Sequence, residues 1–407
     1  MPYFRYVARD KTGILKDEVM EAMSKEDLIN TLQASGLYIV SVGAVSDTKR
    51  KKETKVQYHR GVNNSDLIMF ARELAILLGS GVTLIKSLEV LSKQIQSVPL
   101  FKAVEKIKKD IEGGYTFQNA LRKHKRIFSD FWVNLVETGE ASGHLPLSLD
   151  RLSGYLESSE ELRKKIVSAL VYPTLLVSVS LAALAVFFLK VIPIFTEIFH
   201  GFNVDLPLLT RMIIMMSEIV RKFFFLVIVA GIVGGFIIKK YISTEIGRYQ
   251  FDLFKLKMPM IGVLTQEIAT ERFTSGLATL LKSGVPILHA LEISEKIVSN
   301  KVMERELRVV KTAVRDGKAM YEIMQEIEVF SPLVVQMIGV GEEIGELGEM
   351  LDKISSFYKE RITTFVARFT TLFEPIVLIS MGFVVGVLVI SMFMPIFSIS
   401  TAVRAGS

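Results

Sequence analysis

The sequence predicts a mainly α-helical integral membrane protein with three transmembrane helices, two homologous cytoplasmic helical repeats and a small N-terminal α+β module. Three observations lead to this prediction. A long stretch of the chain occurs twice, three segments are apolar enough to span a bilayer, and the composition is mixed. Half of the 407 residues are hydrophobic while 23% are charged, which is typical of polar domains joined to membrane spans.

The N-terminal module is expected over residues 1–45. Alternating apolar and polar residues predict strands near residues 4–9, 15–20 and 38–45, with a turn at residues 10–13. Ser24, with Asp27 three residues further on, predicts the start of one helix, and Gly36 predicts its end. The polar, basic residues 46–65 that follow are interpreted as a solvated linker rather than as a patch that binds lipid headgroups.

The internal repeat is clearest in a stretch of 22 residues that occurs twice. Residues 70–91 have the sequence FARELAILLGSGVTLIKSLEVL and residues 273–294 have FTSGLATLLKSGVPILHALEIS, with ten identities in 22 positions. Both copies space their apolar residues as one face of a helix does. Gly81 and Gly284 predict the end of that helix, and Pro286 predicts the start of the next one. Each copy is therefore predicted to be a helical hairpin.

A second signature, Gly-Glu-x-x-Gly-x-Leu, also occurs once in each copy and predicts a turn between helices with a carboxylate beside it. Its members are Gly139, Glu140, Gly143 and Leu145 in the first copy, and Gly341, Glu342, Gly345 and Leu347 in the second. Long helical patterns follow and enter apolar runs at the equivalent prolines Pro173 and Pro375. The repeat is thus about two hundred residues long and includes part of the membrane region.

Three segments meet the length of about 20 apolar residues that a helix needs to cross a bilayer. The expected organisation is a first repeat at 66–166, a first span at 167–189, an external loop at 190–222, a second span at 223–242, a second repeat at 243–375, a third span at 376–397 and an external tail at 398–407.

Positive charge at the ends of the spans predicts their orientation. Lys164 and Lys165 precede the first span, and Lys239 and Lys240 follow the core of the second, which favours a cytoplasmic location for both repeats. The N-terminus is then cytoplasmic and the C-terminus periplasmic. Arg211, Arg221 and Lys222, in the loop expected outside, run against this rule.

Small residues at helical spacing in the spans are candidates for close helix packing. They are Gly231 and Gly235 in the second span and Gly382 and Gly386 in the third. The alternative is that these glycines are simply tolerated, since glycine is common in membrane helices.

The sequence carries no signature of catalysis, cofactor binding or a metal site. It has no Gly-rich phosphate loop, no HExxH motif, no serine elbow and no cysteine, and its five histidines are scattered. Glu342, Glu343, Glu346 and Glu349 are interpreted as a solvated helix start rather than a cation site. The net charge of +6 suits a protein that faces anionic headgroups and not a nucleic-acid binder.

The duplicated hairpin, the GExxGxL turn and the Tyr-Pro and Glu-Pro pairs that begin two of the spans resemble the type II secretion F family. That family also contains the inner-membrane platform proteins of type IV pili. The resemblance runs from Asp66 to Phe397, and residues 4–45 are similar to the N-terminal extension of the family. Thr83 stands where the first hairpin of the family usually has a proline, whereas Pro286 keeps it in the second.

The resemblance implies that each repeat is a six-helix bundle and that the protein forms a homo-oligomer in the bacterial inner membrane. It also implies the partners: a cytoplasmic hexameric assembly ATPase, pilin or pseudopilin subunits and other inner-membrane assembly proteins. We therefore expect a platform without an active site that couples the ATPase to movement of pilin-like subunits out of the lipid bilayer. The alternative is a transporter or channel with regulatory cytoplasmic domains, and the uncharged interiors of the spans argue against it.

One turn differs in charge between the two copies. The first copy is basic, with Arg122, Lys123, Lys125 and Arg126, whereas residues 325–328 at the equivalent place carry two glutamates. The hypothesis is that the basic turn contacts the ATPase or its adaptor. The alternative, two unrelated solvated turns, stays open, because exposed charges contribute little individually.

Overall fold

The structure, a computed structural model, describes residues 3–9, 15–35, 37–45, 59, 61–201 and 206–405. The turn expected at residues 10–13, the helix end at Gly36, most of the linker and the tip of the loop around Asn203 lie outside these ranges. The chain divides into two compact units. One comprises Met1–Gly61 with Gln96–Pro99, and the other comprises Val62–Ile95 with Leu100–Ser407.

The first unit contains a three-stranded antiparallel sheet and one helix. The strands β1 (Tyr3–Arg9), β2 (Leu15–Glu21) and β3 (Tyr38–Val45) are arranged in the order β2-β1-β3. The helix α1 (Lys25–Ala34) begins where the sequence predicts, because the Ser24 side chain accepts a hydrogen bond from the Asp27 amide at 3.1 Å. Leu28 and Leu32 on its buried side pack against Phe4 and Tyr6 of the sheet. The small strand-containing N-terminal module is therefore present.

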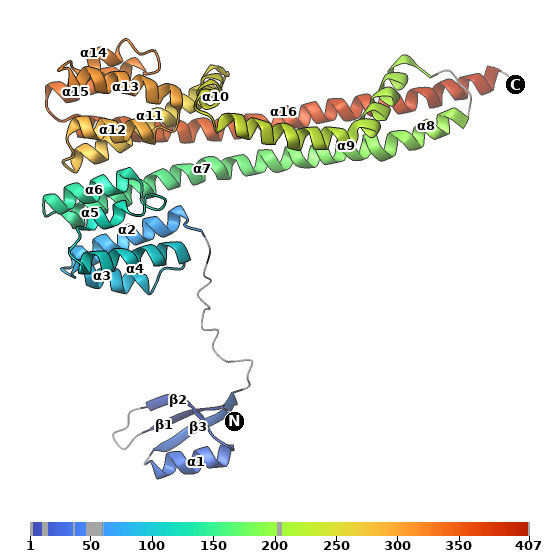
Figure 1. The fold of residues 1–407 in the computed structure, drawn as a ribbon. Coiled ribbons are helices and arrows are strands. Elements are labelled where there is room, and N and C mark those ends of the chain that lie inside the picture. The colour runs from blue at the N-terminus through green and yellow to red at the C-terminus, as the bar shows by residue number, and fades with distance from the viewer. Residues whose placement is uncertain are drawn as a thin grey trace. The chain divides into compact units, whose positions relative to one another are not determined.

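The second unit contains both repeats, and the order of helices in one matches the order in the other (Figure 1). The first repeat consists of α2 (Asn64–Gly79), α3 (Leu84–Ser92), α4 (Val98–Glu112), α5 (Phe117–Arg122), α6 (Asp130–Ala141) and α7 (Leu145–Val186). The second consists of α11 (Ile261–Lys282), α12 (Ile287–Ile297), α13 (Lys301–Arg315), α14 (Met320–Met324), α15 (Pro332–Glu343) and α16 (Leu347–Ala405). A further helix, α10 (Glu245–Lys257), precedes the second repeat.

Glycine ends the first helix of each repeat. Gly81 follows α2 with φ of 83° and Gly284 follows α11 with φ of 86°, a region that favours glycine. Thr83 and Pro286 then have nearly the same extended backbone and stand as the N-caps of α3 and α12. Pro286 therefore stands immediately before the first helical residue of α12, at the helix start that the sequence predicts.

Equivalent aromatic residues fill equivalent parts of the core. Phe70 packs against Phe128 in the first repeat with ring centroids 6.1 Å apart, and Phe273 packs against Phe330 in the second at 6.0 Å. Trp132, the only tryptophan of the chain, lies against both aromatic rings of the first repeat. The apolar spacing in the sequence thus corresponds to the buried face of each repeat.

The last helix of each repeat continues into the apolar part of the chain. The helical segments Leu145–Phe199 and Leu347–Ile396 are long and apolar enough to cross a membrane. A third candidate, within α9 (Leu208–Ile242), exists only if Leu208–Leu226 and Val229–Ile242, which meet at a bend of 53°, count as one span.

Within the segment expected as an external loop, residues 190–201 and 208–222 are helical. After α7, a short π-helix (Phe187–Val191) continues into α8 (Ile192–Gly201), and α9 begins at Leu208. Its apolar residues explain the difference, because Ile192 and Ile213 pack against Leu388 and Met392 of α16 in one buried cluster. Likewise, α16 continues to Ala405 through most of the expected C-terminal tail.

The helices α7 and α16 lie side by side and run in the same direction (Figure 1). Contacts follow one another along both helices in the same order: Glu161 with Lys359 at 2.7 Å, Ala169 with Thr370 at 3.3 Å and Tyr172 with Glu374 at 3.0 Å. Tyr172 and Glu374 are equivalent positions of the two repeats. The two helices are therefore paired in parallel, with equivalent positions side by side at Tyr172 and Glu374.

Glu271 of α11 is a buried carboxylate with no counterpart in the first repeat, where Ile68 stands at the equivalent position. Burial raises the pKa of Glu271 from 4.5 to about 7, and the positive charges of Arg272 and Lys359 offset only part of this effect. The unfolded chain loses this proton near pH 4.5, whereas the folded protein retains it up to about pH 7. Stability should therefore fall as the pH rises through this window.

We expect the variant Glu271→Gln, which cannot ionise, to be more stable than the wild type at pH 8 by about 3 kcal/mol, at about 1.4 kcal/mol per pKa unit. The difference should be close to zero at pH 4.5. Unfolding midpoints of the detergent-solubilised protein at several pH values measure it, with Glu326→Gln, at an exposed position of the same repeat, as the control. A stability difference that does not change with pH would contradict the prediction.

Candidate functional site

The glutamate of the Gly-Glu turn in the first repeat links the end of α6 to the start of α5 through hydrogen bonds. Glu140, close to the end of α6, accepts hydrogen bonds from the backbone amides of Phe117 and Gln118 at 2.9 and 3.1 Å. These amides belong to the first turn of α5, where backbone donors have no partner within the helix. The carboxylate also lies at the positive end of the helix dipole. Glu140 therefore caps a helix that precedes it in the chain.

The second repeat has the same arrangement. Glu342 of α15 accepts hydrogen bonds from the amides of Met320 and Tyr321 at 2.8 and 2.9 Å, at the start of α14. Ala319, the N-cap of α14, has no side chain that could cap the helix. The cap in this repeat therefore depends on Glu342 more than the cap of α5 does, because Thr116 also accepts a hydrogen bond at the start of α5.

The glycines of the same signature allow two helices to approach closely. A Cβ atom on Gly139 would lie 2.6 Å from the Ser148 side chain, and one on Gly341 would lie 3.0 Å from the Cα of Leu347. The later glycines, Gly143 and Gly345, have φ of 74° and 75° and form the turn itself. The signature thus positions the long helices α7 and α16 against the rest of each repeat.

Two of the four cations of the basic turn form ion pairs within the described chain, and two do not. Arg122 pairs with Glu137 at 3.1 Å, and Lys123 pairs with Asp110 at 2.9 Å and lies over the Tyr115 ring. Lys125 and Arg126 are exposed, and the described part of the chain offers neither of them an ion-pair partner. Only these two cations are thus available to another molecule without loss of an internal contact.

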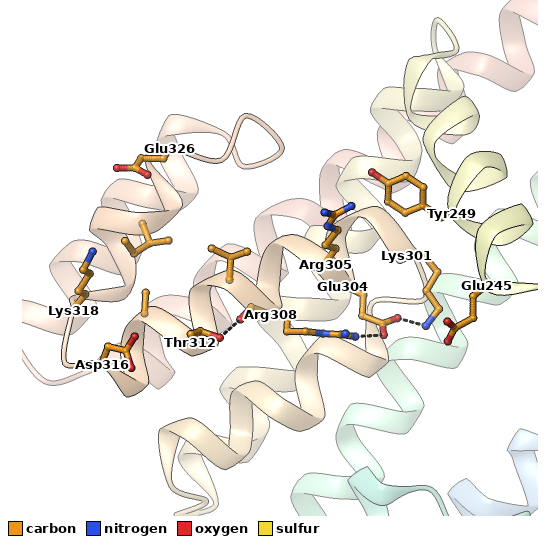
Figure 2. Close-up of a pocket in the computed structure, with 13 residues that line it drawn as sticks. Glu245, Tyr249, Lys301, Glu304, Arg305, Arg308, Thr312, Asp316, Lys318 and Glu326 are labelled. Carbon is orange, nitrogen blue, oxygen red and sulfur yellow. Dashed lines mark hydrogen bonds and ion pairs between the residues drawn. The ribbon is translucent and has the colours of Figure 1, made fainter.

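The acidic turn of the second repeat contributes to a surface pocket of about 820 Å³ between α10, α13 and α14 (Figure 2). Four cations and four carboxylates line it: Lys301, Arg305, Arg308, Lys318, Glu245, Glu304, Asp316 and Glu326. Glu304 binds both Lys301 at 2.6 Å and Arg308 at 3.0 Å, as the dashed lines in Figure 2 show. The lining residues balance one another in charge and include no nucleophile paired with a base.

The glycines predicted for membrane packing face open space within this chain. A Cβ on Gly231, Gly235, Gly382 or Gly386 would meet no atom within 4 Å in the parts of the chain that the structure describes. These glycines therefore do not serve packing between helices of a single copy, and a role in packing between copies stays a prediction. The acidic residues around Glu342 do not form a cluster of metal ligands in the described ranges, where no three acidic or histidine side chains come together as a metal site.

The contact between the two repeats is one feature that sequence reasoning missed. His289 of α12 forms a hydrogen bond with Asn134 of α6, and Arg151 of α7 donates one to the carbonyl oxygen of Lys282. The sequence places His289 among scattered histidines and offers no partner, because Asn134 lies 155 residues away. The equivalent residues in the other repeat, Lys86 and Gln336, differ in type, so the duplication gives no signal either.

We expect Glu140→Gln to weaken the start of α5. The amide keeps one oxygen acceptor but loses the charge and one of the two hydrogen bonds, at a cost of about 1–3 kcal/mol. Amide exchange of residues 117–122 should become roughly ten- to hundredfold faster by mass spectrometry. The control is Glu137→Gln, one helical turn earlier and paired only with Arg122 in the described chain. Unchanged exchange at the start of α5 would show that Glu140 is not the cap.

Comparison with known proteins identifies the family. The family described as "Type II secretion system (T2SS), protein F" matches residues 70–193 and again 273–395, and the "Type II secretion system protein F, N-terminal domain" matches residues 1–43. The two long matches cover most of the two helical repeats, including nearly all of the long apolar helical segments Leu145–Phe199 and Leu347–Ile396 that end them.

Curated relatives match over almost the whole chain. The type IV pilus assembly protein PilC of Thermus thermophilus is 36% identical over 401 residues, 98% of each chain. The protein of the same name from Myxococcus xanthus is 34% identical over 98% of this chain and 96% of its own. The type II secretion system protein F of Xanthomonas campestris is 29% identical over 99% of this chain and 100% of its own. This chain is therefore a member of the type II secretion system protein F family, which includes the PilC proteins of type IV pili.

Proposed function

We propose that this protein is an inner-membrane platform of a type IV pilus or type II secretion machine and that it couples a cytoplasmic assembly ATPase to the movement of pilin-like subunits out of the bilayer. The names of its relatives support the platform role in pilus assembly or secretion. The coupling to an ATPase, the contact with pilins and the homo-oligomer are proposals. So are the three spans, the two six-helix bundles, and the cytoplasmic location of the N-terminus and both repeats.

The continuity of α7 and α16 carries this proposal. Each begins in the core of a repeat and ends in an apolar segment long enough to cross a membrane, with no loop between the two parts. A displacement applied to a repeat therefore reaches the bilayer through a helix and not through a flexible linker. The Gly-Glu turns keep the start of each long helix in close contact with its own repeat.

The orientation of the spans can be tested with reporter tags. Tags placed after Lys240 and near Thr54 should report a cytoplasmic location, and a tag near Asn203 should report a periplasmic one, because basic residues border the cytoplasmic ends of the spans. Paired phosphatase and fluorescent fusions at each position measure this, since each reporter is active on one side only. A cytoplasmic signal near Asn203 would rule out the three-span arrangement.

The proposed contact with the ATPase can be tested by mutation of the basic turn. We expect Lys125→Glu with Arg126→Glu to slow association with the cognate assembly ATPase on the order of tenfold at low salt and to remove most of its salt dependence. Folding should be unaffected, because both side chains are exposed and without an ion pair in the described structure. Stopped-flow or surface-binding kinetics at several salt concentrations measure the effect.

The matched control reverses two other exposed lysines of the same repeat, Lys102→Glu and Lys109→Glu on α4, for the same change in net charge. If both double variants slow association equally, only the overall charge matters. If neither does and assembly continues, the basic turn is not part of the coupling surface.

A further inference from the structure

The contact between the two repeats joins a face of the first to a hairpin of the second. The face lies on α6 and α7, and the hairpin is formed by α11 and α12. Asn134 binds His289, Arg151 binds the carbonyl oxygen of Lys282, and the methyl group of Thr138 lies 3.8 Å from the position of a Cβ on Gly284. Each repeat contains both a face and a hairpin. The contact within the chain involves the face of the first repeat and the hairpin of the second, so the face of the second repeat and the hairpin of the first do not take part in it.

The unused face is on α15 and is apolar. Leu333, Val340 and Ile344 are exposed by 44%, 48% and 54%, although their spacing places them on one side of the helix. The equivalent of Leu333 in the first repeat is Phe131, which is buried. The second repeat therefore presents apolar side chains to solvent at positions where the first repeat has the buried Phe131 and the half-buried Thr138.

The unused hairpin is formed by α2 and α3. Its turn has the same backbone as the turn that contacts α6, since Gly81 and Gly284 have φ of 83° and 86°. It also carries an exposed apolar residue, Ile76, at 59%, where the second hairpin has Thr279. The repeated stretch of 22 residues with ten identities covers this hairpin and the equivalent hairpin of the second repeat, so the two hairpins are closely similar.

We propose that the face on α15 and α16 of one copy binds the α2–α3 hairpin of a second copy, in the way that the first repeat binds the second within the chain. The side chains at the equivalent positions are compatible. Lys86 in place of His289 can donate to Gln336 in place of Asn134, and Lys353 in place of Arg151 can donate to the carbonyl oxygen of Gly79.

The pairing of α7 with α16 favours a second copy as the occupant. These helices run in parallel, and the equivalent residues Tyr172 and Glu374 lie side by side. Continuing this relation places the long helices of the next copy parallel to the first pair, as a shared bilayer requires. The contact is head-to-tail, so each copy can bind one neighbour at each end.

This inference adds a specific surface to the homo-oligomer of the proposed function. It does not depend on the ATPase or on the pilins, and its test measures association alone. Failure of the test would leave the platform role intact, whereas failure of ATPase coupling would leave this contact intact.

The chain has no cysteine, so introduced pairs can be crosslinked without background. Full-length protein carrying Lys86→Cys and Gln336→Cys, in native membranes with a short bismaleimide, should give dimers and a ladder of larger species. Copies with Lys86→Cys alone, mixed by co-expression with copies carrying Gln336→Cys alone, should give dimers and nothing larger, because each copy has a single thiol. Either single variant expressed by itself should stay monomeric on denaturing gels.

The pair Asn134→Cys and His289→Cys is the positive control, because it should link within one copy and change its mobility without adding mass. Given that internal link, the absence of dimers from Lys86→Cys with Gln336→Cys would overturn the proposal. Links between identical single variants would indicate a face-to-face dimer instead. Crosslinking of Gln336→Cys to a different protein would show that another partner covers α15.

A matched pair of substitutions tests the apolar stripe itself. Val340→Asp should reduce the ladder at least tenfold, because the contact would bury an unpaired carboxylate. Val309→Asp should leave it unchanged, since Val309 lies on α13 and is similarly exposed, at 52%. An unchanged ladder in Val340→Asp would also overturn the proposal.

Discussion

The parallel pairing of α7 and α16 is the constraint on which the arrangement of both repeats depends. Each repeat is fixed to the start of one long helix, so the distance and orientation between the repeats follow from how the two helices pack. Leu162, Ile362 and Val366 form a buried cluster between the repeats and the apolar segments, with Lys359 bound to Glu161 at its edge. Such a cluster excludes water from the seam and gives most of its stability, whereas a half-exposed ion pair adds little.

The two repeats keep the same architecture but no longer have the same surroundings. The elements that set the backbone are equivalent: the glycines of the turns, the capping glutamates and the aromatic core. Residues that contact the other repeat have diverged, as with His289 and its equivalent Lys86, or Asn134 and its equivalent Gln336. A duplicated domain in a head-to-tail contact has to diverge in this way, because its two copies do not face the same neighbours.

Local signals in the sequence predicted much of this fold. The hairpins follow from the apolar spacing and from Gly81 and Gly284, because helix ends depend on residues within one turn. The role of Glu140 was not predictable, since the amides it caps lie 22 and 23 residues earlier and only the folded repeat brings them together. The helices at residues 190–201 and 208–222 were not predicted, for a similar reason. Ile192 and Ile213 in them are buried against α16, which is distant in the sequence.

An equivalent proline in each long helix, Pro173 or Pro375, lies where that helix leaves its repeat. Pro173 and Pro375 are inside α7 and α16, and each lacks the amide that would complete the local helical hydrogen bonding. A helix bends most easily at such a position. The residue before each proline, Tyr172 or Glu374, is hydrogen-bonded to its counterpart at 3.0 Å. The two weakened turns are thus side by side and joined, so bending of one long helix at this level is shared with the other.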